Sequence, residues 1–309
     1  MRIAHLSDLH VLALAGVSPH RFLNKRLTGY ANLRLKRKHI HRRSYVEAIA
    51  KEIAASKIDH VVVTGDLTNL ALAEEFAAAR DLLENGLGLT PKDVSVVPGN
   101  HDLYTRGAMR TQRFSKFFAE YIQSDLPDLA AKTPLGAFPF VRLRGPAAII
   151  GLTTAVPRLP FVASGRIGAA QLDAFAKILD HEEVKKRTPV VLIHHPLHNP
   201  SSKLKTLVEG LTDADELAAH LMRATTADGL VLHGHLHRRQ SKILSREHER
   251  VQVVGATSAS LHHHDVDRMA GFNVYEIESD GRVSCVDARV FDPENSSFGT
   301  AQIPRIELT

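Results

Sequence analysis

The chain has 309 residues, of which 44% are hydrophobic and 24% are charged, and its formal net charge is +5. This composition is typical of a folded globular protein and excludes an intrinsically disordered chain, a collagen-like repeat and a coiled coil. His5 and Asp8 interrupt the start of the chain, and no window approaches the run of about 18 apolar residues that a membrane-spanning helix needs, so we expect neither a secretory signal nor such a helix.

Hydrophobic periodicity alternates between strands and helices through the first half of the chain. The predicted strands there are Arg2–Ser7, Ile58–Thr64 and Val94–Val97. The predicted helices are Ser44–Ala55, Ala71–Leu83 and Arg110–Ile122. The stretch Pro127–Pro146 is rich in proline and glycine, and no element is predicted in it.

The same alternation continues and then changes to a period of two. The next predicted elements are strands Ala148–Leu152, Val190–Ile193 and Leu230–Leu232 and helices Ala169–Leu179 and Asp215–Met222. From Gln240 onward an antiparallel meander is predicted, with Asp280-Gly281 as a hairpin turn and strands Lys242–Leu244, Val251–Val254, Phe272–Ile277 and Val283–Val290. We therefore predict one α/β domain over residues 1–309, with a basic helical insert at about 17–43 and a β-rich part at about 240–309.

The positive charge is concentrated in one segment, Arg21–Arg43, which holds nine Lys or Arg and no Asp or Glu. Outside it, 30 basic residues face 34 acidic ones. Leu23, Leu27 and Tyr30 follow helical spacing among these basic residues, which suits peripheral contact with an anionic membrane. The alternatives are a lid that packs on the body and a contact in a homo-oligomer. Nucleic acid is not expected as a partner, because a single basic segment is weak support for it.

Asp, Asn and His side chains follow five of the predicted strands, where loops leave the carboxyl edge of an α/β sheet. They are Asp8 and His10, Asp66, Asn100 to Asp102, His194 and His195, and His235 and His237. Burying so many polar groups costs about 1–3 kcal/mol each unless they are paired or bind a cation. Cys285 is the only cysteine, which excludes thiolate sites and favours a reducing, cytoplasmic compartment, while 19 histidines supply imidazole. These groups predict two divalent or trivalent transition metal ions, Mn, Fe or Zn.

The order D-x-H, G-D, G-N-H-D, H and G-H-x-H resembles the calcineurin-like metallophosphoesterase superfamily over residues 1 to about 260. The compact length and the D-L-H and G-N-H-D motifs look most like its bacterial cyclic-nucleotide and glycerophosphodiester branch. The resemblance implies a four-layer α-ββ-α sandwich of two mixed β-sheets flanked by helices. It also implies that Asp66 bridges two ions, one held by Asp8, His10 and His237 and the other by Asn100, His194 and His235.

By the same resemblance, His101 faces the phosphoryl group and the leaving oxygen and is not a ligand, and Asp102 orients it. The implied reaction is hydrolysis of a phosphodiester by a metal-bound hydroxide, with a cyclic nucleotide, a glycerophosphodiester or a phospholipid head group as substrate. A phosphomonoesterase is the alternative, and a non-catalytic scaffold is disfavoured because every ligand position is occupied. Loop histidines expected to contact substrate are His198, His262 and His263.

Overall fold

The computed structural model describes residues 1–18, 26, 41–159, 162–198, 202–224, 228–246 and 249–306. Most of the basic insert, including its predicted helix and membrane contact, lies outside the described residues. Arg26 is an exception: it is buried and donates to the backbone oxygens of Leu70 (2.7 Å) and Ala71 (3.1 Å). Within the described part of the chain, every helix is too short or too polar to cross a bilayer.

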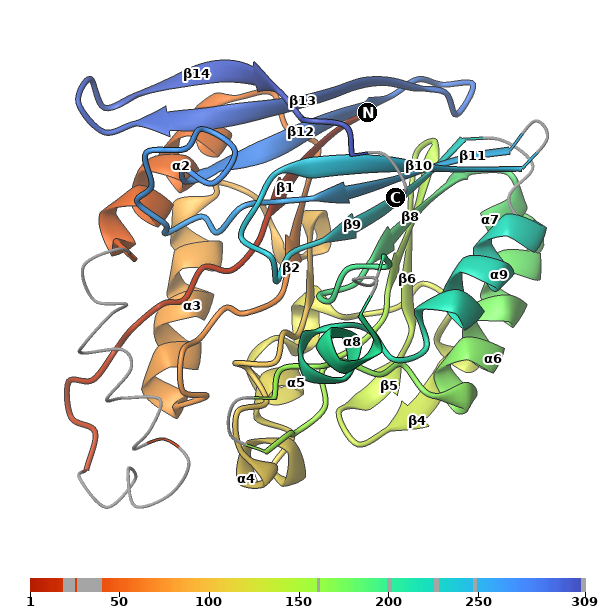
Figure 1. Ribbon diagram of the computed structural model, residues 1–309, viewed down its shortest axis with the longest axis horizontal. Helices are drawn as coiled ribbons and strands as arrows, with labels where there is room; N and C mark the ends of the chain where they lie inside the picture. Colours follow the sequence, from red (N-terminus) through yellow and green to blue (C-terminus); the bar gives the residue numbers. More distant parts are fainter. Residues whose placement is uncertain are drawn as a thin grey trace.

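Two mixed sheets of six strands each form the centre of the molecule (Figure 1). The first has the order β14-β13-β12-β1-β2-β3 and consists of β1 (Arg2–Leu6), β2 (His60–Thr64), β3 (Val94–Val97), β12 (Gly271–Ile277), β13 (Val283–Asp292) and β14 (Ser297–Gln302). The second has the order β10-β11-β9-β8-β7-β6 and consists of β6 (Phe140–Arg144), β7 (Ala147–Gly151), β8 (Thr188–Leu192), β9 (Asp228–His233), β10 (Gln240–Arg246) and β11 (Glu249–Gly255). Strands β1, β2 and β3 are parallel, as are β7, β8, β9 and β11.

Helices cover the outer faces of both sheets (Figure 1). Helices α2 (Arg43–Ala55) and α3 (Ala73–Gly86) pack on the first sheet, and α6 (Ala169–Asp180) and α9 (Ala214–Ala224) pack on the second. The predicted four-layer α-ββ-α sandwich is therefore confirmed. Shorter elements fill the connections: α4 (Arg106–Arg110), α5 (Arg113–Phe117), α7 (Glu182–Lys185), α8 (Lys203–Glu209), β4 (Ala131–Thr133), β5 (Gly136–Phe138) and three 3₁₀ turns at Pro91–Asp93, Ala119–Tyr121 and Pro127–Leu129.

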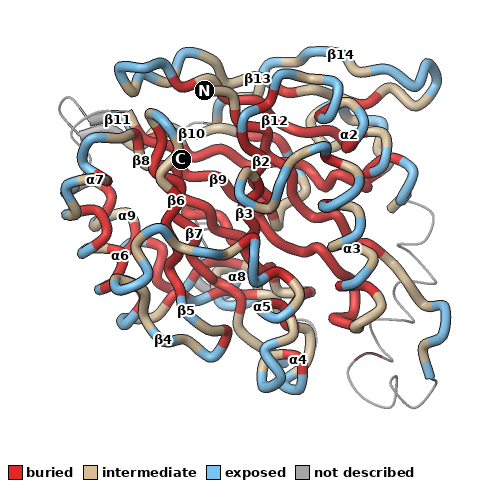
Figure 2. The backbone as a smooth tube through the Cα atoms, turned by 180° about the vertical axis from the view of Figure 1, so that it is seen from behind, coloured by how far each residue is buried: buried red, intermediate tan, exposed pale blue. Residues whose placement is uncertain are grey.

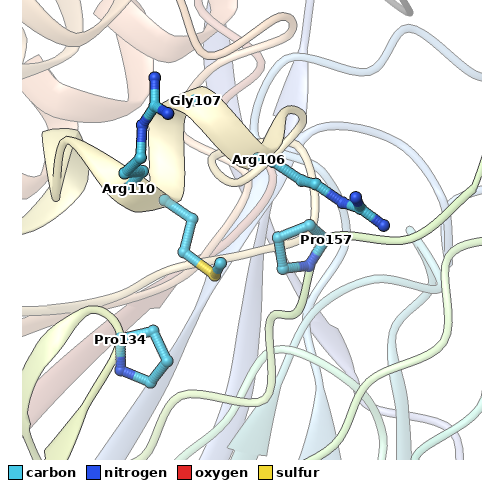
Figure 3. A pocket seen from close by; sticks show the side chains of 6 residues that line it. Arg106, Gly107, Arg110, Pro134 and Pro157 are labelled. Atoms are coloured by element: carbon cyan, nitrogen blue, oxygen red, sulfur yellow. The ribbon is translucent and has the colours of Figure 1, made fainter.

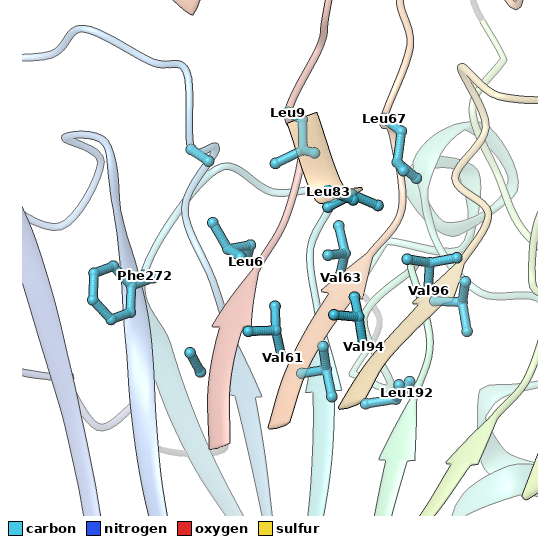
Figure 4. Close-up of a cluster of buried hydrophobic side chains, with 14 of the residues drawn as sticks. Leu6, Leu9, Val61, Val63, Leu67, Leu83, Val94, Val96, Leu192 and Phe272 are labelled. Carbon is cyan, nitrogen blue, oxygen red and sulfur yellow. The ribbon is translucent and has the colours of Figure 1, made fainter. Parts of the chain in front are cut away.

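The alternation of side chains along the strands explains the layering. In β9, Leu230 and Leu232 belong to the core that includes the first sheet, whereas Val231 packs in the core beneath α6 and α9. Figure 4 shows the apolar side chains of β1, β2 and β3 lying together in the first core. Seen from behind, the central strands of both sheets are buried along most of their length (Figure 2).

The prediction of one continuous helix over Arg110–Ile122 is wrong. The chain forms α4 and α5 and then a 3₁₀ turn, and Gln112 between the two helices has a left-handed φ of 48°. This break turns the chain so that Phe114 and Phe118 are both buried against α3. Sequence reasoning also missed β6 and the β4–β5 hairpin, because their proline and glycine residues lie at strand ends and turns instead of interrupting a strand.

The predicted single meander from Gln240 onward is also wrong. β10 and β11 pair with each other in the second sheet, where β11 runs parallel to β9, while β12, β13 and β14 extend the first sheet antiparallel to β1. Residues 256–270 cross between the two sheets. A period of two identifies a strand but not its partner, so the pattern could not separate these two groups.

Candidate metal centre

The carboxyl ends of β1, β2 and β3 in the first sheet and of β8 and β9 in the second bring the candidate ligand side chains together. Single ligand atoms of Asp8, His10 and Asp66 all lie within 4.8 Å of one another. His237 Nε2 lies 3.1 Å from Asp8 Oδ1 and 3.2 Å from His10 Nε2. His194 Nε2 lies 3.5 Å from Asp66 Oδ2 and 3.1 Å from the Oδ1 atom of Asn100. One continuous cluster of oxygen and nitrogen donors results.

The backbone is strained at this cluster. Left-handed φ values occur at five of the predicted ligands: Asp8 (52°), His10 (46°), Asp66 (52°), His235 (68°) and His237 (49°). Outside glycine, such conformations cost about 1–3 kcal/mol each and concentrate at functional sites. These sharp turns follow β1, β2 and β9 and direct polar side chains into the cluster.

Two glycines of the motifs are required by close packing. A Cβ at Gly99 would overlap Asp66 Oδ1, and a Cβ at Gly234 would overlap the side chains of Ser7 and Asp8. Each glycine precedes a predicted ligand, Asn100 or His235. The glycines therefore let neighbouring strand ends approach closely enough to share one cluster.

Backbone carbonyls set the orientation of two imidazoles. His194 Nδ1 donates to Thr64 O at 2.7 Å, which turns its Nε2 toward the cluster. His235 Nε2 donates to Glu209 O at 3.0 Å, which turns its Nδ1 toward Asn100 Oδ1 at 3.2 Å. Such partners set the tautomer of a metal-binding histidine, so Nε2 of His194 and Nδ1 of His235 are the nitrogens that would bind a metal.

The electrostatics of the cluster fit bound cations. Asp8 and Asp66 are 0% and 2% exposed, and among the described residues their only ion-pair partners are histidines. Burial would raise the pKa of Asp66, but His194 and His101 lower it well below its usual range. Burial lowers the pKa of His194, yet the charges of Asp66 and Asp8 outweigh it and raise this pKa to about 9. Two buried carboxylates need compensating positive charge. Metal ions would supply it, and the surrounding carboxylate, amide and imidazole groups are donors that transition metals bind.

His101 lies beside the cluster, but Asp102 does not hydrogen-bond to its ring as expected. The His101 ring lies edge-on to His10 with 5.0 Å between ring centroids, and its Nδ1 donates to Asn69 O at 2.8 Å. The Asp102 carboxylate instead accepts N–H groups of Leu67, Thr68 and Gly99 and the hydroxyl of Thr68. Asp102 therefore ties together the loops after β2 and β3, and the expectation that it orients His101 is corrected: the Asn69 carbonyl does so.

The three histidines predicted to contact substrate have other neighbours. His198 Nε2 lies 2.9 Å from Gln240 Nε2, and burial, with the charge of Lys242, lowers the pKa of His198 to about 4. His262 Nδ1 pairs with the Tyr45 hydroxyl at 2.9 Å, and His263 Nδ1 accepts the N–H of Asp265. His262 and His263 line a cavity of about 490 Å³ beside β13 and β14. A substrate role for these three residues stays a prediction.

Two further histidines lie against the cluster. His195 packs on His235 with 4.5 Å between ring centroids, but both its nitrogens pair elsewhere, with Thr154 Oγ1 and Ala163 O. His195 therefore supports the loop after β8. His41 lies 4.8 Å from His10, centroid to centroid, and sequence reasoning missed it as a site residue. Its only sequence signal was membership of the basic segment, which says nothing about this contact.

A cavity of about 640 Å³ lies at α4, between the loops that follow β3 and β7 (Figure 3). It is lined by Arg106, Gly107, Met109, Arg110, Pro134 and Pro157. The loop after β3 also carries Asn100 and His101, and the Tyr104 ring stacks on His101 at 5.6 Å between centroids. Arg106, which lines the cavity, follows His101 by five positions in the chain.

Comparisons with known proteins agree with this geometry. Residues 1–239 match the family described as Calcineurin-like phosphoesterase. A dimetal phosphatase from Danio rerio has a similar structure, with a TM-score of 0.59, 12% identity and 98% of each chain covered. Purple acid phosphatase PPD1 from yellow lupin (Lupinus luteus) gives 0.60 and 13%, with 98% of this chain and 53% of that chain covered. No curated protein matches the chain. Since the family match spans most of its length, the chain belongs to the calcineurin-like phosphoesterase family.

Proposed function

We propose that this chain is a dinuclear metal-dependent phosphodiesterase. The observation that carries the proposal is the convergence of donors from five strand ends on two buried carboxylates, Asp8 and Asp66. In the proposed arrangement Asp66 is shared by two ions. Asp8, His10 and His237 would hold the first ion, and Asn100, His194 and His235 would hold the second. Mn, Fe or Zn suits this set of carboxylate, amide and imidazole donors.

Each residue of the cluster has a task that follows from its contacts. Two cations, when bound, would neutralise phosphoryl charge and lower the pKa of water. The backbone N–H of His101 holds Asp66 Oδ1 at 2.7 Å, so this carboxylate is fixed where both groups of ligands can share it. Because His101 Nδ1 donates to Asn69 O, its Nε2 is the nitrogen that would give a proton to the leaving oxygen, the ring passing from imidazolium to neutral imidazole. General acid catalysis of this kind contributes about 10²–10⁴-fold.

The charge of the cluster supports a diester over a monoester. A phosphate monoester carries about −1.5 to −2 at neutral pH, whereas a diester carries a single charge. Among the described residues, no Lys or Arg forms an ion pair with Asp8 or Asp66, so the metal ions would be the main cations beside these two carboxylates. The cavity at α4, lined by residues that follow Asn100 and His101 in the chain, is the proposed position of the second ester group. Cyclic nucleotides, glycerophosphodiesters and phospholipid head groups are the proposed substrate classes, and a phosphomonoesterase is the alternative.

Elemental analysis and two chromogenic substrates test the proposal. We expect two transition metal ions per chain and a higher kcat/KM on bis-p-nitrophenyl phosphate than on p-nitrophenyl phosphate. Asp66→Asn should lose both ions, because a shared ligand is weakened, and His237→Ala should lose mainly one. Asp173→Asn, an exposed change on α6, is the matched control and should keep both.

Two outcomes would contradict parts of this proposal. Protein that retains no transition metal and gains no activity with added Mn²⁺ would refute the dinuclear centre. A consistent preference for monoesters over diesters would replace the phosphodiesterase with the phosphomonoesterase alternative.

A further inference from the structure

His41 places a third imidazole beside His10 and His237. One ligand atom from each of these three residues lies within 4.8 Å of the others. The ring of His41 lies edge-on to both neighbours, with centroid distances of 4.8 Å to His10 and 5.7 Å to His237. His41 comes from the residues that precede α2, whereas His10 and His237 follow β1 and β9. Three separate segments of chain thus converge on one side of the cluster.

A chain of hydroxyl groups holds the His41 ring in place. Its Nδ1 pairs with Ser260 Oγ at 2.7 Å, and Ser260 Oγ lies 3.1 Å from Ser258 Oγ. Ser258 Oγ in turn donates to the backbone oxygen of Asp8 at 2.6 Å. The backbone is fixed too, because His41 pairs with Leu261 in an antiparallel bridge. The loop that crosses between the sheets therefore joins the position of His41 to that of Asp8.

The geometry points to His41 as a further metal ligand, at the ion proposed for Asp8, His10, Asp66 and His237. An imidazole whose Nδ1 is engaged by a hydrogen-bond partner binds a metal through Nε2, and such a partner fixes the ring for that purpose. This inference rests on the proposed dinuclear function. It makes the two sites unequal: the first has five protein ligands, and the second has four, Asp66, Asn100, His194 and His235. The first ion then has fewer positions left for substrate than the second.

Titration with Co²⁺ tests this assignment without any substrate. Binding is followed by calorimetry and by the visible absorption of Co²⁺, which reports its coordination. We expect wild type to bind two ions and His41→Ala to weaken one of them by at least 10-fold, about the smallest effect known for partners of metal ligands, with a changed spectrum. Ser260→Ala, which removes only the partner of Nδ1, should weaken the same ion less.

Two further variants serve as controls for this experiment. His264→Ala removes an exposed histidine from the same crossing loop and should leave both affinities unchanged. His41→Gln keeps a polar group for Ser260, so it tests the ligand role if His41→Ala fails to fold. If wild type and the His41 variants bind Co²⁺ with equal affinity and give equal spectra, His41 is not a metal ligand and the inference is overturned. A rise in KM alone would then mean that His41 contacts the substrate only. Failure of wild type to bind Co²⁺ would instead refute the dinuclear proposal.

Discussion

Glu75 is a buried carboxyl group in the first turn of α3 whose ionisation opposes folding. Its Oε2 accepts the backbone N–H groups of Leu70 (2.8 Å) and Leu72 (3.2 Å), while its Oε1 is buried and has no hydrogen-bond partner among the described residues. Burial raises the pKa of Glu75 from 4.5 to about 7, against the smaller lowering effect of the two hydrogen bonds. The folded state therefore keeps a proton that the unfolded state releases at lower pH.

The free energy of unfolding should consequently fall as pH rises from about 4.5 to about 7. At about 1.4 kcal/mol for each pKa unit, this shift corresponds to about 3 kcal/mol above pH 7. Glu75→Gln keeps an oxygen acceptor for Leu70 and Leu72 but cannot ionise. We expect it to stabilise the protein by about 3 kcal/mol at pH 8 and by about 1 kcal/mol or less at pH 5.

Urea unfolding of wild type and of Glu75→Gln at pH 5 and pH 8 measures the difference in their free energies of unfolding. All other titratable groups are present in both proteins, so their contributions cancel in this difference. Glu74→Gln removes a partly exposed carboxylate from the same turn and serves as the matched control. If Glu75→Gln changes stability equally at both pH values, Glu75 is ionised in the folded state and the reasoning is wrong.

Four further predictions concern the site and its support. His101→Ala should keep both ions but lose about 10²–10⁴-fold in kcat on alkyl esters and less on aryl esters; equal losses would contradict its role at the leaving group. Gly234→Ala should lower metal content by elemental analysis, because its Cβ overlaps Asp8. Phe175→Ala, buried on α6, should cost about 3–5 kcal/mol in urea unfolding without altering metal content. Arg106→Ala should raise KM up to about fivefold for substrates with a second negative charge, but not for bis-p-nitrophenyl phosphate.

The ligand cluster was predictable because its residues lie at strand ends. Runs such as Val61-Val62-Val63 indicate buried parallel strands, and the carboxyl ends of such strands meet at one edge. Asp8, Asp66 and Asn100 follow three neighbouring strands of the first sheet in this way. Asp66 and His194, which 128 positions separate in the sequence, follow strands of different sheets, and the packing of the two sheets brings them together. Most strands and helices were predictable because each carries its own period of apolar residues, whereas their arrangement in four layers was implied by the family resemblance.

Contacts between distant segments were decided only by the tertiary structure. His41 reaches the cluster because Ser260 and Leu261 hold it, and both belong to a loop that joins the two sheets. Asp102 is next to His101 in sequence, yet its carboxylate turns to the loops after β2 and β3.

The strands from Gln240 onward show the same limit, since their period was evident while their division between two sheets was not. Periodicity is a property of a few adjacent residues and can be read locally. The partner of a hydrogen bond or of a strand depends on which surfaces the whole chain buries together, and a local pattern does not contain that information.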